Sequence, residues 1–552
     1  MTAETTIPRV SRLAIFLVGF SVGLFAWTAA EGQKLGLHQV MPESILRHEA
    51  CVSVAISDMK YGLNRGYVCY KSVREELYQH GWSWNPDVLA KTGVPYPTNM
   101  TARDRLDYGL AQACNLPDPA AGGIDHLPVF AEDVGYTDFV KLGFTLFGIK
   151  LGSLYSAYFV VMGAGLALYL LAYRRDVAML LLLLAFQVGF FFLVRAIPTM
   201  GTVPAQPDVR FQLGTVINGR FLGTLGLIPF FHLAGCLLTW PRASWWQVAL
   251  ATGQAALLGL ALHFRGSVVW MFLTLFAMAA APAGMWVWRN RRTMVSHPFS
   301  IAAGGRLLAL RWPVVVVLLG LVGQKAFVKS HAHWLYHTDD GLPNHLVWHN
   351  ALMGLQLHDD WKNQPINYGK DSDGLSWSAV DEFLVQEGID KQHHVSALNG
   401  YYKPRLHDEL CRRIYLGFAP GNPKYMAELF LWYKPRMIWR QFTNCWGWIK
   451  PGFSRTDGVC LLVAFGACVL LGVRTAPSGW RVPVGIAAVG FVGSLLPMFW
   501  AYAIYHVMGE FLLLTGMLAV AGVAGAVGAV TRVKLPTGVR VRLPGAAGRV
   551  GG

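Results

Sequence analysis

The hydrophobic residues of the chain fall into long runs. About 20 consecutive apolar residues cross a bilayer core of roughly 30 Å. Runs of about this length lie at 13–30, 151–173, 177–199, 219–240, 244–263, 267–288, 311–328, 457–474, 482–503 and 508–530. The second and third are separated only by Tyr-Arg-Arg-Asp at 173–176, which allows no more than a tight helical hairpin. The pattern predicts an all-α integral membrane protein with about ten transmembrane helices.

Basic residues lie on one side of these predicted spans. With the N-terminus inside, the inner loops and both ends of the chain hold 17 basic residues and two acidic ones, Glu4 and Asp176. Cytoplasmic segments carry such an excess. We therefore expect a multi-pass protein of the cell (inner) membrane with both termini cytoplasmic. A cleaved signal peptide is the alternative for the first run, where 26–30 would allow cleavage; an uncleaved anchor is favoured.

This topology divides the chain into six parts. They are a cytoplasmic tail with the first span (1–30), a first extracytoplasmic loop (31–150), a core of six spans (151–328), a second extracytoplasmic loop (329–456), three final spans (457–530) and a basic cytoplasmic tail (531–552). Both long loops are expected to be rich in α-helix. Helices are predicted at 72–80 and 102–114, and an interfacial helix on the membrane is predicted at about 139–147. The aromatic stretch 422–440 predicts two helical segments broken at Pro435.

The composition agrees with the membrane assignment. Of the 552 residues, 54% are hydrophobic and 14% are charged, whereas soluble proteins carry about 25% charged residues. A net charge of +15 would suggest nucleic acid in a soluble protein, but here the charge lies in the inner segments. The expected partner is therefore the lipid bilayer and not a nucleic acid. P-loop, Rossmann and kinase glycine motifs are absent from the sequence.

The second outer loop opens with many histidines and aspartates. Imidazole and carboxylate groups together suit a divalent metal such as zinc, manganese or iron. The candidate ligands are His331, His333, His337, Asp339 and Asp340, and His345 and His349 further on would share one helical face. Interfacial anchoring by His and Trp beside solvated Asp pairs is the alternative. Cys51 with Cys69, and Cys411 with Cys445, are plausible disulfide pairs outside the cell.

Several ionisable residues fall within or near the predicted spans, where they are costly and more often functional. His506 and Glu510 are spaced i, i+4 near the start of the last span. Cations near the outer ends could hold a lipid phosphate by charge-assisted hydrogen bonds. The candidates for phosphate or donor binding are Arg195, Arg220, Lys325, His506 and Glu510. Snorkelling to the interface explains Arg195 and Arg220 equally well.

Two segments carry a resemblance to a known class. The sequence Gly-Tyr-Thr-Asp-Phe-Val-Lys-Leu-Gly-Phe-Thr-Leu-Phe-Gly at 135–148, followed by the apolar run 154–171 and Arg174-Arg175, is similar to the junction between outer loop and second span in the GT-C membrane glycosyltransferases. The stretch 422–440 resembles an outer-loop segment of such proteins. The resemblance covers mainly residues 130–330 and 420–530.

The resemblance implies sugar transfer from a polyprenyl-phosphate donor to an extracytoplasmic acceptor, with an acidic residue of the first outer loop as general base. A carboxylate must take the proton of the acceptor hydroxyl, and a basic group must stabilise the departing phosphate. Glu132, Asp133 and Asp138 are nearest the return to the membrane and are the first choices. Glu31, just after the first span, is closer to where the class usually has its acid.

Two other functions remain open from the sequence. A non-catalytic multi-pass protein of envelope assembly would tolerate replacement of Glu132, Asp133 and Asp138. A transporter would often show internal hydropathy repeats, and no convincing two-fold pattern occurs in the sequence; its function would depend on Glu510 or His506.

Overall fold

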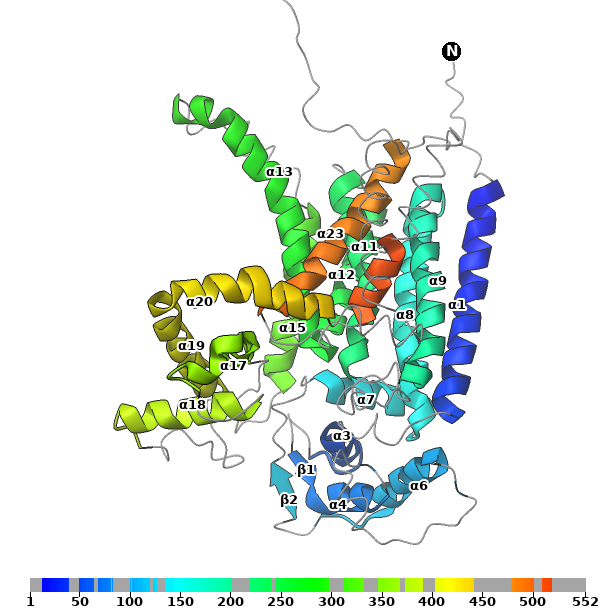
Figure 1. Ribbon diagram of the computed structural model, residues 1–552. Coiled ribbons are helices and arrows are strands. Elements are labelled where there is room, and N and C mark those ends of the chain that lie inside the picture. The colour runs from blue at the N-terminus through cyan, green and yellow to red at the C-terminus, as the bar shows by residue number, and fades with distance from the viewer. Residues whose placement is uncertain are drawn as a thin grey trace, which may run out of the picture.

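The structure is a computed structural model of the chain. It describes residues 12–38, 49–63, 68–80, 82, 100, 102–119, 123–126, 135–200, 219–239, 244–296, 312–331, 346–367, 373–390, 403–440, 478–500 and 509–518. These residues form a bundle of long apolar helices. One helical lobe lies below the bundle and a second lies beside its lower part (Figure 1).

Seven of the described helical segments are long and apolar enough to cross a membrane, by length and composition. They lie in α1 (Arg12–His38), α8 (Leu151–Tyr173), α9 (Val177–Met200), η2 (Gly219–Gly226) with α11 (Leu227–Thr239), α12 (Trp245–Phe264), α15 (Trp312–His331) and α23 (Ser478–Trp500). Shorter apolar helices, Gly266–Ala281 within η3 (Gly266–Val268) and α13 (Val269–Ser296) and Gly509–Leu518, lie on two more predicted spans. The predicted span 457–474 is outside the described residues.

The predicted hairpin between α8 and α9 is present, and Asp176 explains its sharpness. Its carboxylate oxygen Oδ1 accepts hydrogen bonds from the backbone N–H groups of Ala178 and Met179, each at 3.1 Å. These groups belong to the first turn of α9 and have no partner within the helix. A side chain that caps them allows a new helix to start directly after Arg174 and Arg175.

The first lobe comprises α3 (Glu49–Tyr61), β1 (Val68–Tyr70), α4 (Lys71–Gln79), α6 (Ala102–Asn115), β2 (Ile124–His126) and α7 (Gly135–Phe147). The predicted helices at 72–80 and 102–114 are confirmed as α4 and α6, whereas α3 and the strand pair were not predicted. The two strands are antiparallel, with Cys69 opposite Asp125. Buried residues of α3, α4 and α6 belong to the same hydrophobic core as the bundle helices, so this lobe is an extension of the bundle.

Helix α7 lies across the lower end of the bundle, where the sequence predicts an interfacial helix (Figure 1). It packs on α3 of the first lobe and on α8 and α12 of the bundle. Phe139 and Phe144 are buried, while Leu146 is 55% exposed and Phe147 37% exposed. Most of the apolar face of α7 therefore contacts protein, and only its last turn presents large apolar side chains to the surroundings.

The second lobe has a hydrophobic core of its own. It comprises α17 (Val347–Met353), η4 (Gly354–Leu357), η5 (Asp359–Asn363), α18 (Asp373–Gln386), α19 (Pro404–Gly421), α20 (Pro423–Glu428), the π-helical turn η7 (Leu429–Tyr433) and a last helical stretch to residue 440. The predicted break at Pro435 is wrong, because helix continues through that residue. The π-helical turn directly before it relaxes the regular hydrogen-bond pattern where proline cannot donate.

The second lobe docks on the end of α23. Trp500 Nε1 donates a hydrogen bond of 2.9 Å to the carbonyl of Val347, and the rings of Trp348 and Trp500 meet edge-to-face at 5.0 Å. Lys434 is buried, and its ammonium donates to the carbonyls of Phe499 and Trp500. Both lobes thus meet the bundle toward the end at which α1 and α15 finish (Figure 1).

Lys434 predicts a pH dependence of this docking. Burial lowers the pKa of Lys434 to about 7, so the folded chain binds fewer protons than the unfolded chain between about pH 7 and the ordinary value of 10.5. Stability rises with pH wherever the unfolded state binds more protons. We expect the unfolding temperature in detergent to rise between pH 7.5 and 9.5, and Lys434→Met to remove most of that rise. An equal rise in both proteins would contradict this assignment.

Candidate active site

Asp138 and His263 meet where the first lobe joins the bundle. Asp138 lies in the first turn of α7, and His263 lies in the last turn of α12. Atoms Oδ2 of Asp138 and Nε2 of His263 are 2.7 Å apart. The contact depends on Gly135, because a Cβ atom there would lie 2.0 Å from the carbonyl oxygen of His263. Only glycine allows α7 to approach the backbone of α12 so closely.

Lys141 connects this pair to the first lobe. Its Nζ lies 3.0 Å from Oδ1 of Asp138 and 2.9 Å from Oδ2 of Asp58, which belongs to α3. Burial alone would raise the pKa of Asp138, but the hydrogen bond with His263 and the charge of Lys141 outweigh it and hold this pKa below its ordinary value. Asp138 is therefore a carboxylate at neutral pH, and two neighbours fix its orientation.

His263 also lines an apolar groove between α12 and α15. The groove has a volume of about 450 Å³, which is within the usual range for small-molecule sites. Helices α12 and α15 approach closely, since a Cβ atom on Gly259 would lie 3.2 Å from the carbonyl oxygen of Gly320. The lining residues are Thr252, Ala255, Ala256, Gly259, Leu260, His263, Val316, Leu319, Gly320, Gly323, Gln324 and Phe327. The apolar groove thus extends to His263 of the Asp138–His263 pair.

Glu510 is a second buried acid, inside the bundle. It packs against Gly223 of η2, where a Cβ atom would meet Oε1 of Glu510 at 1.9 Å. Neither carboxylate oxygen has a hydrogen-bond partner among the described residues. Arg265, which directly follows α12 and is only 3% exposed, is near enough to interact with it electrostatically. The predicted pairing of Glu510 with His506 is not tested, because His506 lies outside the described residues.

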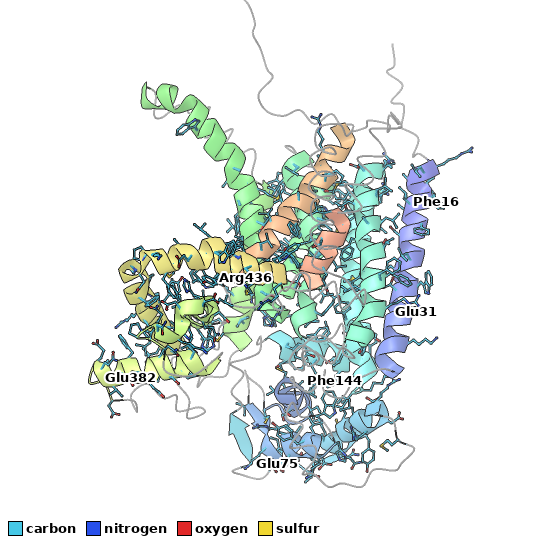
Figure 2. The ribbon with its side chains drawn as sticks, viewed as in Figure 1. Phe16, Glu31, Glu75, Phe144, Glu382 and Arg436 are labelled. Atoms are coloured by element: carbon cyan, nitrogen blue, oxygen red, sulfur yellow. The ribbon has the colours of Figure 1, made fainter. Side chains whose placement is uncertain are left out.

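The other predicted acids do not join this site. Glu31 does not follow the first span: α1 continues to His38, so Glu31 is half-buried inside a helix that packs on α8 and α9. Figure 2 shows it on α1, at the side of the bundle away from the second lobe. Glu132 and Asp133 lie outside the described residues. Of the four predicted catalytic acids, Asp138 is the one that the structure places in a cluster of polar groups.

The predicted phosphate-binding cations are dispersed. Arg195 is exposed at the end of α9, with its guanidinium 5.6 Å from the ring centre of Phe191. Lys325 is exposed on α15 but does not line the groove, whose α15 residues lie on the opposite face of that helix. Arg220 is described only as part of the backbone of η2. The structure therefore places neither Arg195 nor Lys325 among the residues that line the groove.

The predicted metal ligands cannot be placed. His331 ends α15, with no side chain described, and His333, His337, Asp339 and Asp340 lie outside the described residues, as does His345. A different group, His349, His407 and Cys411, could hold a metal ion, because one ligand atom of each lies within 4.8 Å of the others. The predicted pair Cys51 and Cys69 is buried but not joined by a disulfide, and Cys445 is outside the described residues.

Three residues of the site, His263, Lys141 and Asp58, were not predicted from the sequence. His263 is the last residue of a predicted span and Asp58 lies in an unpredicted helix, so neither carried a motif. One signal was present in the sequence: Asp138 and Lys141 are three residues apart and share a helical face. Comparison of the chain with protein-family models, with curated proteins and with solved structures finds no match.

Proposed function

We propose that the protein is a membrane enzyme that transfers a sugar from a polyprenyl-phosphate donor to an acceptor on the extracytoplasmic side. The observation that carries the proposal is the apolar groove between α12 and α15, which reaches His263 in its hydrogen bond with Asp138. The donor has the same two-part character: a long apolar chain and a reactive sugar phosphate. The apolar groove suits the polyprenyl chain of the donor, and the Asp138–His263 pair suits the transfer of its sugar.

The pair can act as a general base. When Nε2–H of His263 donates to the Asp138 carboxylate, Nδ1 of the ring is the nitrogen that can accept a proton. An acceptor hydroxyl attacks the anomeric carbon and passes its proton to this base, while the bond from that carbon to the phosphate oxygen breaks and the polyprenyl phosphate leaves with the electron pair. Asp138 stabilises the imidazolium that forms.

A phenylalanine at Gly323 tests the groove. A Cβ atom on Gly323 meets nothing within 4 Å, although Gly323 lines the groove. The Cβ atom of Gly323→Phe therefore meets open space, and we expect its ring to occupy the groove and to weaken donor binding at least about tenfold, the effect of roughly 1.4 kcal/mol. Binding of a labelled polyprenyl-phosphate sugar to the purified chain in detergent measures it.

Gly19→Phe is the matched control. Gly19 lies in α1, and a Cβ atom there also meets nothing within 4 Å. The control should bind the donor as the wild type does, and both variants should keep the wild-type unfolding temperature. Wild-type donor binding by Gly323→Phe would exclude the groove as the donor site.

The second candidate is a non-catalytic protein of envelope assembly. The observation in its favour is that Asp58, Lys141 and Asp138 also form a structural tether between α3 and α7. In that case the ion pairs would hold the first lobe on the bundle. Substitutions at these three residues would then change stability and partner binding, and the protein would catalyse no sugar transfer.

A further inference from the structure

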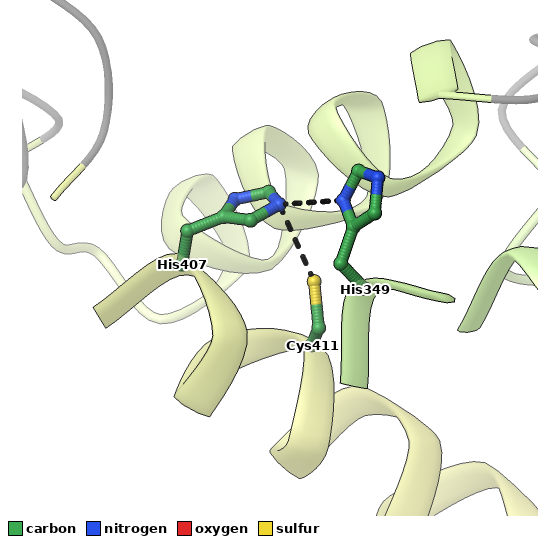
Figure 3. A group of neighbouring side chains, drawn as sticks. All are labelled: His349, His407 and Cys411. Atoms are coloured by element: carbon green, nitrogen blue, oxygen red, sulfur yellow. Dashed lines mark hydrogen bonds between the residues drawn. The ribbon is translucent and has the colours of Figure 1, made fainter. Parts of the chain in front are cut away.

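We propose that His349, His407 and Cys411 bind one divalent transition-metal ion and that this ion stabilises the second lobe. Their two nitrogen donors and one sulfur donor favour zinc. The three side chains come from two helices. His407 and Cys411 lie one turn apart on α19, and His349 faces them from α17 (Figure 3). The proposal is independent of the proposed transferase function, because it concerns the core of the second lobe.

The distances between the ligand atoms fit a metal centre. Nδ1 of His349 is 3.1 Å from Nε2 of His407, and that nitrogen is 3.6 Å from Sγ of Cys411. With Zn–N bonds of about 2.0–2.1 Å and Zn–S bonds of about 2.3 Å, tetrahedral geometry places two nitrogens about 3.4 Å apart and a nitrogen and a sulfur about 3.6 Å apart. Small shifts of two rings would complete three corners of a tetrahedron.

The surroundings hold the ligands in place and offer a fourth donor. Asp408 accepts hydrogen bonds from the backbone N–H groups of Trp348, at 2.7 Å, and His349, at 3.0 Å, which fixes the start of α17. The ring of Trp377 stacks on His407 with centroids 3.9 Å apart. The hydroxyl of Ser376 lies 2.7 Å from Nδ1 of His349, and is thus at hand for the fourth position.

Burial and donor chemistry select the kind of ion. His407 and Cys411 are fully buried and His349 is 8% exposed. Burial favours the neutral ring of His407, the form that binds metal. Nitrogen and sulfur donors favour zinc over magnesium or calcium. As the metal–sulfur bond forms, the thiol proton of Cys411 passes to solvent.

The site would join two distant parts of the chain. His349 and His407 are 58 positions apart in sequence, and the core of this lobe is separate from that of the bundle. A metal ion that binds only the folded lobe stabilises it by mass action. This buried position, enclosed by α17, α18 and α19, is typical of a structural ion.

Metal analysis of the full chain tests the proposal. The tag-free protein in detergent is equilibrated with zinc and desalted, and its zinc content is measured by mass spectrometry. We expect about one zinc per wild-type chain, a loss of most of it in Cys411→Ser and His407→Gln, and no loss in His358→Gln. His358 is the matched control, because it is a buried histidine of the same lobe that pairs with Glu428 at 3.0 Å.

Two further measurements do not depend on the variants. Cobalt in place of zinc should give the wild type a thiolate-to-cobalt charge-transfer band, and a chelator should lower its unfolding temperature. Wild-type protein that retains no zinc, zinc that persists in Cys411→Ser, or a disulfide between Cys411 and Cys445 would each overturn the proposal. If sugar transfer were absent while zinc remained bound, the metal-site proposal would still hold and only the proposed transferase function would fail.

Discussion

Replacement of Asp138 by Asn should lower the rate of the proposed sugar transfer by about 10²–10⁴-fold, the usual contribution of general acid–base catalysis, because His263 needs the Asp138 carboxylate to act as the base. The change conserves shape, but it removes the negative charge that faces Nε2 of His263 and Nζ of Lys141. An amide cannot stabilise the imidazolium that forms when His263 takes a proton. The measurement is turnover of a labelled polyprenyl-phosphate sugar in proteoliposomes, with the unfolding temperature recorded in parallel.

Two acids provide the controls. Asp58→Asn removes the charge that faces Lys141 at 2.9 Å but leaves the Asp138–His263 pair in place, so transfer should fall by less than about tenfold. Glu31→Gln, on α1, should leave transfer unchanged. If Asp58→Asn and Asp138→Asn lose activity and stability equally, the cluster is a structural tether, and the non-catalytic alternative is favoured.

Replacement of Gly135 by Ala should reduce transfer at least about 10²-fold, the effect of displacing a catalytic group by about 1 Å. The new Cβ atom would lie 2.0 Å from the carbonyl oxygen and 2.4 Å from the carbonyl carbon of His263, and backbone atoms cannot turn away as a side chain can. Helix α7 must therefore move from α12 and carry Asp138 with it. The same transfer assay measures the loss.

Gly417→Ala is the control for this substitution. Gly417 is exposed on α19, and a Cβ atom there meets nothing within 4 Å. Transfer should stay at the wild-type level, and stability should rise by up to about 1 kcal/mol because alanine favours helix over glycine. Wild-type transfer by Gly135→Ala would mean that the close packing of α7 on α12 is not needed for the reaction.

The bundle was largely predictable from the sequence because lipid imposes a simple rule. A span must be helical and apolar over about 20 residues, and the predicted run 151–173 coincides with α8. The lobes follow no such rule. The break expected at Pro435 is absent because a preceding π-helical turn accommodates it, and the pairing of β1 with β2 joins residues more than fifty positions apart.

The candidate active site was predictable only in part, because its contacts join residues that are far apart in the sequence. Asp138 was identifiable as an acid beside a helix that returns to the membrane. Its partner His263 is 125 positions away, and the contact depends on how α7 packs across α12. The buried group of His349, His407 and Cys411 likewise joins two helices. Its only local trace is the i, i+4 spacing of His407 and Cys411, which is common by chance.

We propose that a lipid-linked sugar donor binds between α12 and α15 and that this chain transfers its sugar. The most direct measurement follows wild-type proteoliposomes with a panel of polyprenyl-phosphate sugars and extracytoplasmic acceptors, and quantifies both products by mass spectrometry. We predict that glycosylated acceptor and sugar-free polyprenyl phosphate appear in equal amounts. Donor lipids that remain intact with every acceptor, while the folded protein still binds them, would contradict it.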